Sequence, residues 1–572
     1  MRRMVAEERR AQVAYFTMEV ALREDLPTYS GGLGVLAGDF LMSAADAGAD
    51  MLAVTILHRQ GYLRQVIDAS GSQVDEPVVW RPEDVLELLA PRTTVRIGSR
   101  SVLVAAWRLV VTGATGESID VYFLDTDLPD NHNADRDLSG RLYGGDNEYR
   151  LRQEALLGLG GVAMLRELGH DAVDTYHMNE GHSSLLTLAL LEERMSEASN
   201  AVHPVPARFV DSVRKRCVFT THTPVPAGHD RFADGLVKDV LGPDRAQLLD
   251  EIGCIVDGEL NMSWLGMRMS RAANAVSQRH REVAQAMFPT VPMLAVTNGV
   301  HAHRWVSAPF RELFDKSIPG WRCNNDLLRY VSQIDAAEIA AAHQASKQLL
   351  LDTVAQRTDR KLDPAALTIG AARRVTPYKQ TTMIFSDLER LTRAAQSIGP
   401  VQIVCAGKAH PRDEEGKALV SELVRIAAAV RGPLDVVFLE DYDLDLAATL
   451  CAGSDIWLNT PLKPLEASGT SGMKAALNGV PSLSVLDGWW LEGCVEGVTG
   501  WAIGNGAAGD NDPVASELYD KLESVVLPVF YGQALTLAGI RRAAIALNGS
   551  FFNTERMLRE YSSVVYKGGA VK

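Results

Sequence analysis

Glu466-Ala467-Ser468-Gly469-Thr470-Ser471-Gly472-Met473-Lys474 is a glycine-rich loop that leads into helical sequence at 475–478. Small residues let a backbone approach a ligand closely, and the unpaired amides in the first turn of a helix attract anions. We therefore expect a phosphate group at this loop. Lys474 lies four residues after Thr470 and shares its helix face. That placement suits an amine that neutralises a phosphate, or one that forms a Schiff base with a phosphorylated aldehyde cofactor.

The glycine loop follows one of several short apolar, β-branched runs that alternate with amphipathic stretches. Such alternation predicts an α/β class, with parallel sheets and crossover helices. Ligands of these sheets lie beyond the carboxyl ends of the strands. The predicted strands are 13–16, 51–57, 218–221, 294–297, 367–371, 401–406, 436–439 and 456–459, and the predicted helices include 148–168, 335–357 and 414–430.

The length of 572 residues is too great for one ordinary core,. We predict two Rossmann-like lobes, 1–325 and 326–572, that face a central cleft, with the boundary near Pro319-Gly320-Trp321. The last helix is expected to pack back on the first lobe. With strand ends from both lobes, the cleft between them is the natural ligand site.

Composition excludes several classes of protein. A hydrophobic share of 47% and a charged share of 23% are those of an ordinary globular chain,. The net charge of -15 opposes nonspecific binding to nucleic acid,. No apolar run approaches the ~18 residues of a membrane span, and residues 1–8 lack the apolar segment of an export signal. We expect a cytoplasmic protein with no membrane partner, in which six scattered cysteines are buried thiols,.

Three cations, Arg373, Arg374 and Lys379, follow the predicted strand 367–371. Cations at the end of a buried strand are hard to reconcile with a solvated face. Arginine offers a fork that matches phosphate oxygens and lysine a compact charge, so together they can clamp a doubly charged anion. The alternative is that they pair with carboxylates at the rim of the lobe.

Other strand ends and loops carry groups without charge. Tyr29-Ser30-Gly31-Gly32-Leu33 precedes helical sequence at 35–47, and on these residues alone a tight turn and an anion contact are equally good interpretations,. Thr220-Thr221-His222-Thr223-Pro224 and Val296-Thr297-Asn298-Gly299-Val300 each follow an apolar run and turn sharply. These two segments present polar groups toward the same expected cleft.

The sequence predicts no metal site. His177 and His182 are five residues apart, not the four of a helical zinc motif, so we interpret 177–182 as a supporting segment,. The run from Asp125 to Asp130 opens like a calcium loop, but Pro129 occupies a ligand position and Asp130 the place of the required glycine,.

The segment 466–474 resembles the one by which glycogen and α-glucan phosphorylases hold pyridoxal phosphate. The resemblance extends from Ala14-Tyr15-Phe16 to Phe552-Asn553-Thr554-Glu555-Arg556-Met557, and it is stronger to the short bacterial and archaeal type than to the longer animal type. It implies a GT-B-type glycosyltransferase fold and the reversible phosphorolysis of an α-glucan or maltodextrin by inorganic phosphate, which yields glucose-1-phosphate. Regulation by phosphorylation is not expected. The oligomeric state stays open, with a homodimer as one option.

The resemblance also implies roles for individual residues. Lys474 would carry pyridoxal phosphate, and Arg374 and Lys379 would clamp the substrate phosphate. Further cofactor contacts are implied for Thr470, Ser471, Arg373 and Tyr442. Substrate contacts are implied for Gly32, Leu33, His222, Asn298, Glu466, Ser468 and Gly469. Where the longer phosphorylases place an arginine after the tyrosine, this chain has Asp443, so the cofactor phosphate is expected to be bound differently.

Two other classes of protein compete with this hypothesis. Glycogen synthase-like transferases often carry Glu-x7-Glu, whose second carboxylate binds the nucleotide ribose, and here that position is Lys474. They also tend to have Lys-Thr-Gly-Gly-Leu where this chain has Tyr29-Ser30-Gly31-Gly32-Leu33. A non-catalytic glucan-binding protein would be expected to lose its clustered charges, which are all present. Both alternatives are therefore less favoured than a phosphorylase.

Overall fold

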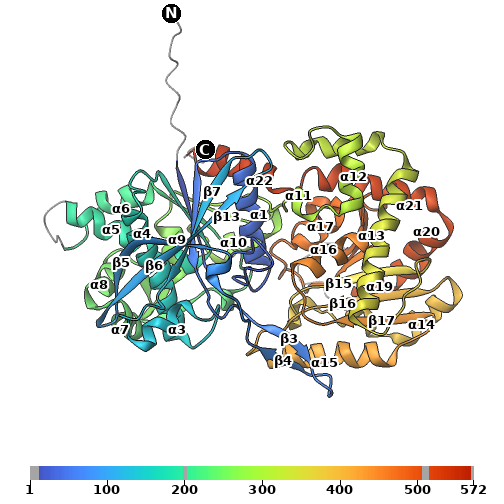
Figure 1. Ribbon diagram of the computed structural model, residues 1–572, viewed down its shortest axis with the longest axis horizontal. Coiled ribbons are helices and arrows are strands. Elements are labelled where there is room, and N and C mark those ends of the chain that lie inside the picture. Colours follow the sequence, from blue (N-terminus) through green and yellow to red (C-terminus); the bar gives the residue numbers. More distant parts are fainter. Residues whose placement is uncertain (1–11, 198–202, 505–513, 568–572) are drawn as a thin grey trace, which may run out of the picture.

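The computed structural model describes residues 12–197, 203–504 and 514–567. Two α/β lobes lie side by side, each built on its own sheet (Figure 1). The predicted α/β class is confirmed, because both sheets are largely or wholly parallel and are covered by helices. Residues 1–8, from which no export signal was expected, lie outside the described residues.

The first lobe contains a nine-stranded sheet whose central strands are buried on both faces, as their continuous apolar sequence predicts,. The runs 13–16, 51–57 and 218–221 are confirmed as strands, whereas the strand predicted at 294–297 ends earlier, at Ala295. The first seven strands in spatial order pair in parallel, and the last two pairings, of β7 with β6 and of β6 with β5, are antiparallel. In spatial order they are β14 (Met293–Ala295), β13 (Ala272–Ala275), β9 (Cys217–Thr220), β8 (Thr175–Asn179), β1 (Val13–Thr17), β2 (Met51–Ile56), β7 (Ser118–Asp125), β6 (Arg100–Thr112) and β5 (Glu87–Ile97).

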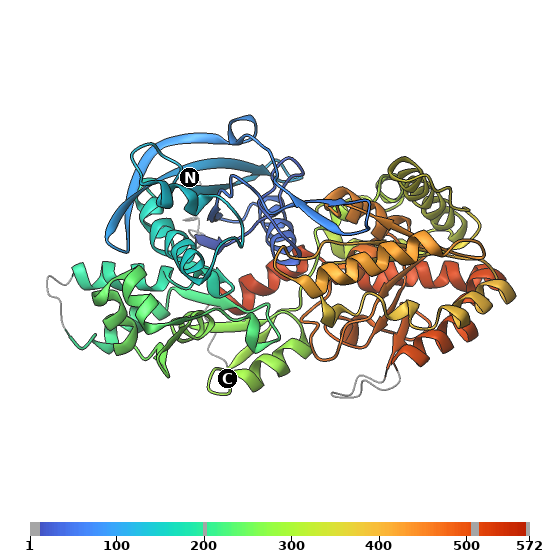
Figure 2. The same cartoon turned by 90° about the horizontal axis from the view of Figure 1, so that it is seen from below.

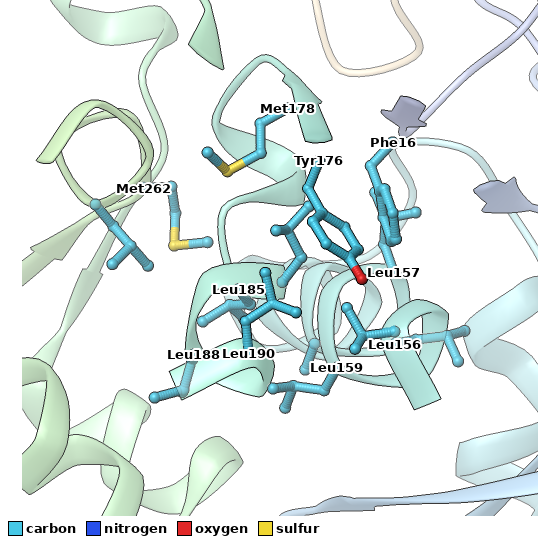
Figure 3. Close-up of a cluster of buried hydrophobic side chains, with 14 of the residues drawn as sticks. Phe16, Leu156, Leu157, Leu159, Tyr176, Met178, Leu185, Leu188, Leu190 and Met262 are labelled. Atoms are coloured by element: carbon cyan, nitrogen blue, oxygen red, sulfur yellow. The ribbon is translucent and has the colours of Figure 1, made fainter. Parts of the chain in front are cut away.

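Helices cover both faces of this sheet. One face packs on α1 (Gly32–Asp46) and α22 (Thr554–Glu560), and the other on α3 (Asn147–Ala155), η3 (Leu156–Gly160), α4 (Gly161–Glu167) and α5 (Leu186–Glu197). The run α3, η3 and α4 confirms the helix predicted at 148–168, with a π-helical turn in its middle. Figure 3 shows Phe16 and Tyr176 of the sheet above the leucines of η3. Gly161 permits this approach, because a Cβ there would lie 2.7 Å from the Phe16 ring.

The second lobe contains a six-stranded, wholly parallel sheet. All four runs predicted as strands in this half are confirmed, as are the helices α13 (Ala336–Arg357) and α15 (Glu414–Ala429). The strands in spatial order are β17 (Leu434–Leu439), β16 (Val401–Ala406), β15 (Leu367–Ala372), β18 (Ile456–Asn459), β19 (Ser482–Val485) and β20 (Gly500–Ile503). The helices α14 (Leu388–Ser397), α16 (Leu444–Gly453) and α17 (Thr470–Leu477) flank it.

The chain crosses between the lobes twice. After β14 it passes through α11 (Ala302–Trp305), α12 (Ala308–Ser317) and η6 (Asn325–Gln333), which pack with Met473 and Trp489 of the second lobe in one apolar cluster. It returns near Asn553, and α22 then packs on α1. A third connection is the hairpin of β3 (Arg64–Ile67) and β4 (Gln73–Glu76), which extends from the first lobe to the second (Figures 1 and 2).

Among the described residues, no single helix is long and apolar enough to cross a membrane. One bent pair, Val514–Gly532 and Ala534–Gly549, passes the same length and composition test with an angle of 103° between its parts.

Candidate active site

A cavity of about 570 Å³ lies where the carboxyl ends of strands from both sheets meet,. Every site residue named from the sequence lines it. The lining from the second lobe includes Arg373, Arg374, Lys379, Tyr442, Glu466, Ser468, Gly469, Thr470, Ser471 and Lys474. The lining from the first lobe includes Gly32, Leu33, His222 and Asn298.

The glycine loop is shorter than its sequence suggests. The sequence places the start of the helix at Ala475, but α17 begins at Thr470, so this prediction is corrected. Gly469 adopts a left-handed conformation with φ of 89°, which lets the chain turn directly into the helix,. No side chain of the described residues caps this helix, so the amides of Thr470 and Ser471 in its first turn have no capping partner there,.

Lys474 lies in the second turn of α17 and is 6% exposed. Its Nζ lies 3.8 Å from the centroid of the Trp305 ring. Within the described part of the chain it has no hydrogen bond and no carboxylate within ion-pair distance, and burial lowers its pKa. A buried amine without a partner has a larger neutral, nucleophilic fraction than an ordinary lysine.

The three cations after β15 have three different environments. The Nζ of Lys379 lies 2.6 Å from a carboxylate oxygen of Glu466. Burial alone would lower the pKa of Lys379, but the Glu466 carboxylate outweighs it and the pKa is raised. Arg373 is buried and donates to Asn459 Oδ1 at 2.7 Å and to the Leu458 carbonyl at 2.8 Å.

Arg374 is the cation that stays available. Its side chain is exposed within the cleft, and among the described residues it forms no ion pair. The alternative interpretation, in which all three cations pair with carboxylates at the rim of the lobe, therefore does not hold for Arg374.

The carboxylate of Glu19 binds the backbone of the first-lobe glycine loop, residues 29–33. Glu19 accepts from the backbone amide of Ser30 at 2.6 Å and that of Gly31 at 3.3 Å, and from the hydroxyl of Tyr143 at 2.9 Å. The helix α1 then starts at Gly32, and no side chain in the described part of the chain caps it. The amides at its start face the cavity opposite α17, so two helix N-termini approach the same space,.

Several buried polar atoms of cavity-lining residues have no hydrogen-bond partner among the described residues. They include His222 Nε2, Asn298 Oδ1 and Ser468 Oγ. Burial lowers the pKa of His222 to about 4, so its ring is neutral near pH 7. Buried polar atoms are almost always bonded, so such a group on a cavity wall indicates a ligand with hydroxyls.

The segment 177–182, interpreted from the sequence as supporting, does support the His222 loop. Glu180 accepts from the His222 amide at 2.7 Å and from Thr223 Oγ1 at 3.0 Å. Glu180 and His182 also line the cavity. Asp443, at the position where the resemblance implies an arginine, caps α16 by accepting from the Leu446 amide at 2.8 Å.

Several lining residues were not identified from the sequence. They include Glu19 after β1, Arg412 after β16, Tyr62 and Tyr143 in first-lobe loops, and Arg150 on α3. For Glu19 and Arg412, the position after a strand is the signal that could have found them. Lys408 and His410 also line the cavity, in the segment 406–411 that follows the predicted strand 401–406 and resembles the corresponding phosphorylase segment.

One group of metal-ligating atoms adjoins the cavity. Ligand atoms of Glu154, His182 and Asp230 lie within 4.8 Å of one another. The Arg150 guanidinium already lies among them, 2.7 Å from an Asp230 oxygen and 2.8 Å from His182 Nε2. Burial raises the pKa of Glu154 well above its usual range. The geometry indicates a site for the Arg150 cation and not for a metal.

These features define a class of protein: a two-lobed α/β protein whose cleft can accept an anion beside a hydroxylated ligand,. A family model of carbohydrate phosphorylases matches residues 213–496. The chain is 36% identical to the maltodextrin phosphorylase of Thermococcus litoralis, over 97% of this chain and 70% of that protein. It is also 36% identical to the glycogen phosphorylase of Mycobacterium tuberculosis, over 98% and 71%. An uncharacterized protein of Methanocaldococcus jannaschii is 32% identical over 97% and 99%. The chain belongs to the carbohydrate phosphorylase family, which confirms the resemblance stated from its sequence.

Proposed function

We propose that the protein is an α-glucan phosphorylase that uses inorganic phosphate to release glucose-1-phosphate, with retained configuration, from the end of an α-1,4-linked glucan. One observation carries the proposal: the Lys474 amine, which has no hydrogen bond or ion pair within the described chain, shares a cavity with Arg374, which forms no ion pair there. The related maltodextrin and glycogen phosphorylases support the choice of substrate.

The cavity fits pyridoxal phosphate as a cofactor. Lys474 would hold it covalently through Nζ, and the free amides of Thr470 and Ser471 would bind its phosphate,. Tyr442 and Arg373 also line the cavity and would contact the cofactor. When bound, the cofactor supplies a phosphate group that can exchange a proton with the substrate phosphate.

The protein's own groups would bind the substrate phosphate by exchanging partners. Lys379, now paired with Glu466, would turn toward the anion together with Arg374,. The Glu466 carboxylate would then be free to accept from a sugar hydroxyl. His222, Asn298 and Ser468 offer the unpartnered atoms that would fix the same sugar,.

The reaction then needs no carboxylate pair. The substrate phosphate would protonate the departing glycosidic oxygen as the bond from that oxygen to C1 breaks. Positive charge develops on the sugar ring, and the phosphate held by Arg374 and Lys379 would stabilise it and form the new bond to C1. Both events would occur on one face of the sugar, which accounts for retention.

The test combines a cofactor measurement with a substrate measurement. Borohydride reduction of protein supplied with pyridoxal phosphate should label the peptide that contains Lys474, at about one group per chain. Maltodextrin with inorganic phosphate should release glucose-1-phosphate, whereas ADP-glucose and UDP-glucose should not support glucosyl transfer. Transfer from a sugar nucleotide at a comparable rate, without any labelled lysine, would reject the proposal in favour of a synthase-like enzyme.

A further inference from the structure

The β3–β4 hairpin belongs to the first lobe in sequence but lies against the second lobe in space (Figures 1 and 2). Its two strands form a separate two-stranded sheet, outside the nine-stranded one. A two-stranded hairpin is marginally stable on its own in water. Its conformation therefore depends on the surface that it contacts, which is the segment after β16 together with α15 and the end of β17.

A buried glutamine makes the central contact. Gln73 is 7% exposed, which is unusual for a polar residue of a protruding hairpin,. Its Nε2 donates to the carbonyl of Ala409 at 2.9 Å, and its Oε1 accepts from the amide of the same residue at 3.0 Å. The carboxamide thus pairs with Ala409 as a neighbouring strand would.

A second buried glutamine extends this contact. Gln65 is 1% exposed, and its Nε2 donates to the Gly407 carbonyl at 2.9 Å and to Gln73 Oε1 at 2.8 Å. The Gln65 Oε1 accepts from the backbone amide of Asp441 at 2.9 Å, and the backbone amide of Gln65 donates to Asp441 Oδ1 at 3.1 Å. One side chain therefore connects the hairpin to the ends of both β16 and β17.

Apolar and charged contacts surround the two glutamines. Ile67 packs against the buried cluster of Val375, Ala409 and Val420. Asp75 lies 2.8 Å from the ammonium of Lys417 on α15. Because the glutamine amides lie inside this contact, any separation of the lobes would leave buried polar groups unpaired.

The segment held by the hairpin is bonded in turn to the proposed phosphate clamp. The carbonyl of Lys408 accepts from the Val375 amide at 2.9 Å, and that of Ala406 accepts from the Arg373 amide at 3.2 Å. Both neighbours of Arg374 are thus fixed to the segment 406–409. Arg374 forms no ion pair with any described residue, and its side chain hydrogen-bonds to Tyr378 of the same segment. Its position therefore follows the backbone of the segment 373–378.

We propose that the β3–β4 hairpin is a positioning element for the phosphate clamp: it holds the segment 406–409 across the lobe interface and thereby fixes Arg374 in the cavity. The inference rests on the proposed phosphorolysis. It makes phosphate binding and hairpin docking reciprocal, because an anion that binds only the aligned clamp also stabilises the docked hairpin.

The test replaces Gln73 by methionine, which has a similar length and no amide, and uses Val74→Ala on the same strand as the matched control. Val74 is 43% exposed. In Gln73→Met the KM for phosphate should rise roughly tenfold, since the four hydrogen bonds of the carboxamide with Ala409, Gln65 and Asp75 are lost, while the KM for glucan changes less than about twofold,. Hydrogen exchange should accelerate at 373–376 and 406–409, and saturating phosphate should slow it again. Val74→Ala should match wild type in all these measurements.

The outcomes separate the two proposals. Wild-type protein that shows no phosphorolysis of any glucan contradicts the function itself. Normal wild-type turnover, with an unchanged phosphate KM in Gln73→Met despite faster exchange at Ala409, overturns the positioning role alone. Equal increases in the KM for phosphate and the KM for glucan would also overturn it, because they would indicate that the whole active site has become less ordered. If Gln73→Met does not fold, Asp75→Asn, which removes only the peripheral charge opposite Lys417, should raise the phosphate KM by a smaller factor, and an unchanged value would reject the proposal.

Discussion

The two walls of the cavity present polarity in opposite ways. On the first-lobe wall, the carboxylates of Glu19 and Glu180 bond to backbone amides and orient loops, so that amides and neutral side chains face the ligand. On the second-lobe wall, Arg374 and Lys474 have no anionic partner among the described residues, and Lys379 has one that lies in the cavity itself. We therefore propose that the first lobe recognises the shape and hydroxyls of the ligand and that the second lobe supplies the charge.

This division explains how a chain with a net charge of -15 can bind an anion. The attraction must be local, and it arises where the ends of β15 and α17 approach each other. Charge on one wall and geometry on the other also mean that substitutions on the two walls should alter different kinetic constants.

The largest effect is expected at Lys474. In Lys474→Arg the positive charge remains but the nucleophilic amine is lost, so borohydride should no longer label the peptide. Phosphorolysis should fall by roughly a thousandfold or more, about 4 kcal/mol in activation free energy. The measurement is peptide mapping together with glucose-1-phosphate release.

Lys463 provides the matched control for this experiment. It is a second buried lysine of the same loop, its Nζ has no hydrogen-bond partner among the described residues, and it does not line the cavity. Lys463→Arg should keep the label. If the label disappears in Lys463→Arg and persists in Lys474→Arg, the cofactor is attached to Lys463, and the assignment to Lys474 is wrong.

The next effect concerns the clamp. Lys379→Ala and Arg374→Ala should each cost about 2 kcal/mol or more in transition-state stabilisation, seen in both the rate at saturating glucan and the phosphate KM. Lys379→Ala should be the worse, because it also leaves the Glu466 carboxylate buried without its partner,. Steady-state kinetics with varied phosphate provide the measurement.

A surface arginine serves as the control for the clamp. Among the described residues, Arg393 is paired only with Glu389 on α14, one helical turn away, and Arg393→Ala should leave both constants unchanged. If the clamp variants also keep wild-type phosphate dependence, the segment 373–379 does not bind substrate.

The charged wall could be predicted from the sequence because its residues are clustered. Arg373, Arg374 and Lys379 stand together after one strand, and Glu466 to Lys474 form one loop, so each leaves a local signature. The start of α17 was placed five residues late because the loop's glycines and serines are poor helix formers, and only packing decides that Thr470 is helical,.

The remaining parts of the structure were not predictable for a physical reason. Glu19, Tyr143 and Arg150 are single residues in unrelated segments, and only the fold brings them together. Gln65 and Gln73 have the sequence signature of exposed hairpin residues, and it is the second lobe that buries them. Strand β5 and the second half of β6 mix buried and exposed residues, unlike the continuous apolar runs on which the strand prediction relied,.

A smaller effect is expected on the first-lobe wall. Asn298→Ala removes a side chain whose Oδ1 has no partner within the described chain, so stability should change little. Loss of about 1 kcal/mol of sugar binding should raise the KM for maltodextrin roughly fivefold and leave the phosphate KM unchanged. An equal rise in both constants, measured by the same assay, would contradict the division of labour between the walls.

The smallest effect is a pH dependence of stability. It arises from Asp487, which lies behind the second-lobe wall of the cavity. Asp487 accepts from the Glu466 amide at 2.9 Å and from the Gly488 amide at 3.0 Å. Burial nevertheless raises its pKa from 3.8 to about 6. The folded protein therefore binds this proton more tightly than the unfolded chain does. The contribution of Asp487 to stability is complete below about pH 4 and is lost as the pH rises through about 6.

Asp487→Asn stays neutral throughout this range and removes the linkage. Other carboxylates shift the stability of both proteins in the same way, so the informative quantity is the difference in melting temperature between wild type and variant. This difference should move in favour of the variant between about pH 4 and pH 7, by roughly a few degrees, and stay constant above that range. Melting curves at half-unit intervals provide the measurement. A difference that is flat across the whole range would mean that Asp487 titrates normally, and that the Glu466 loop rests on an ionised carboxylate like those behind the opposite wall.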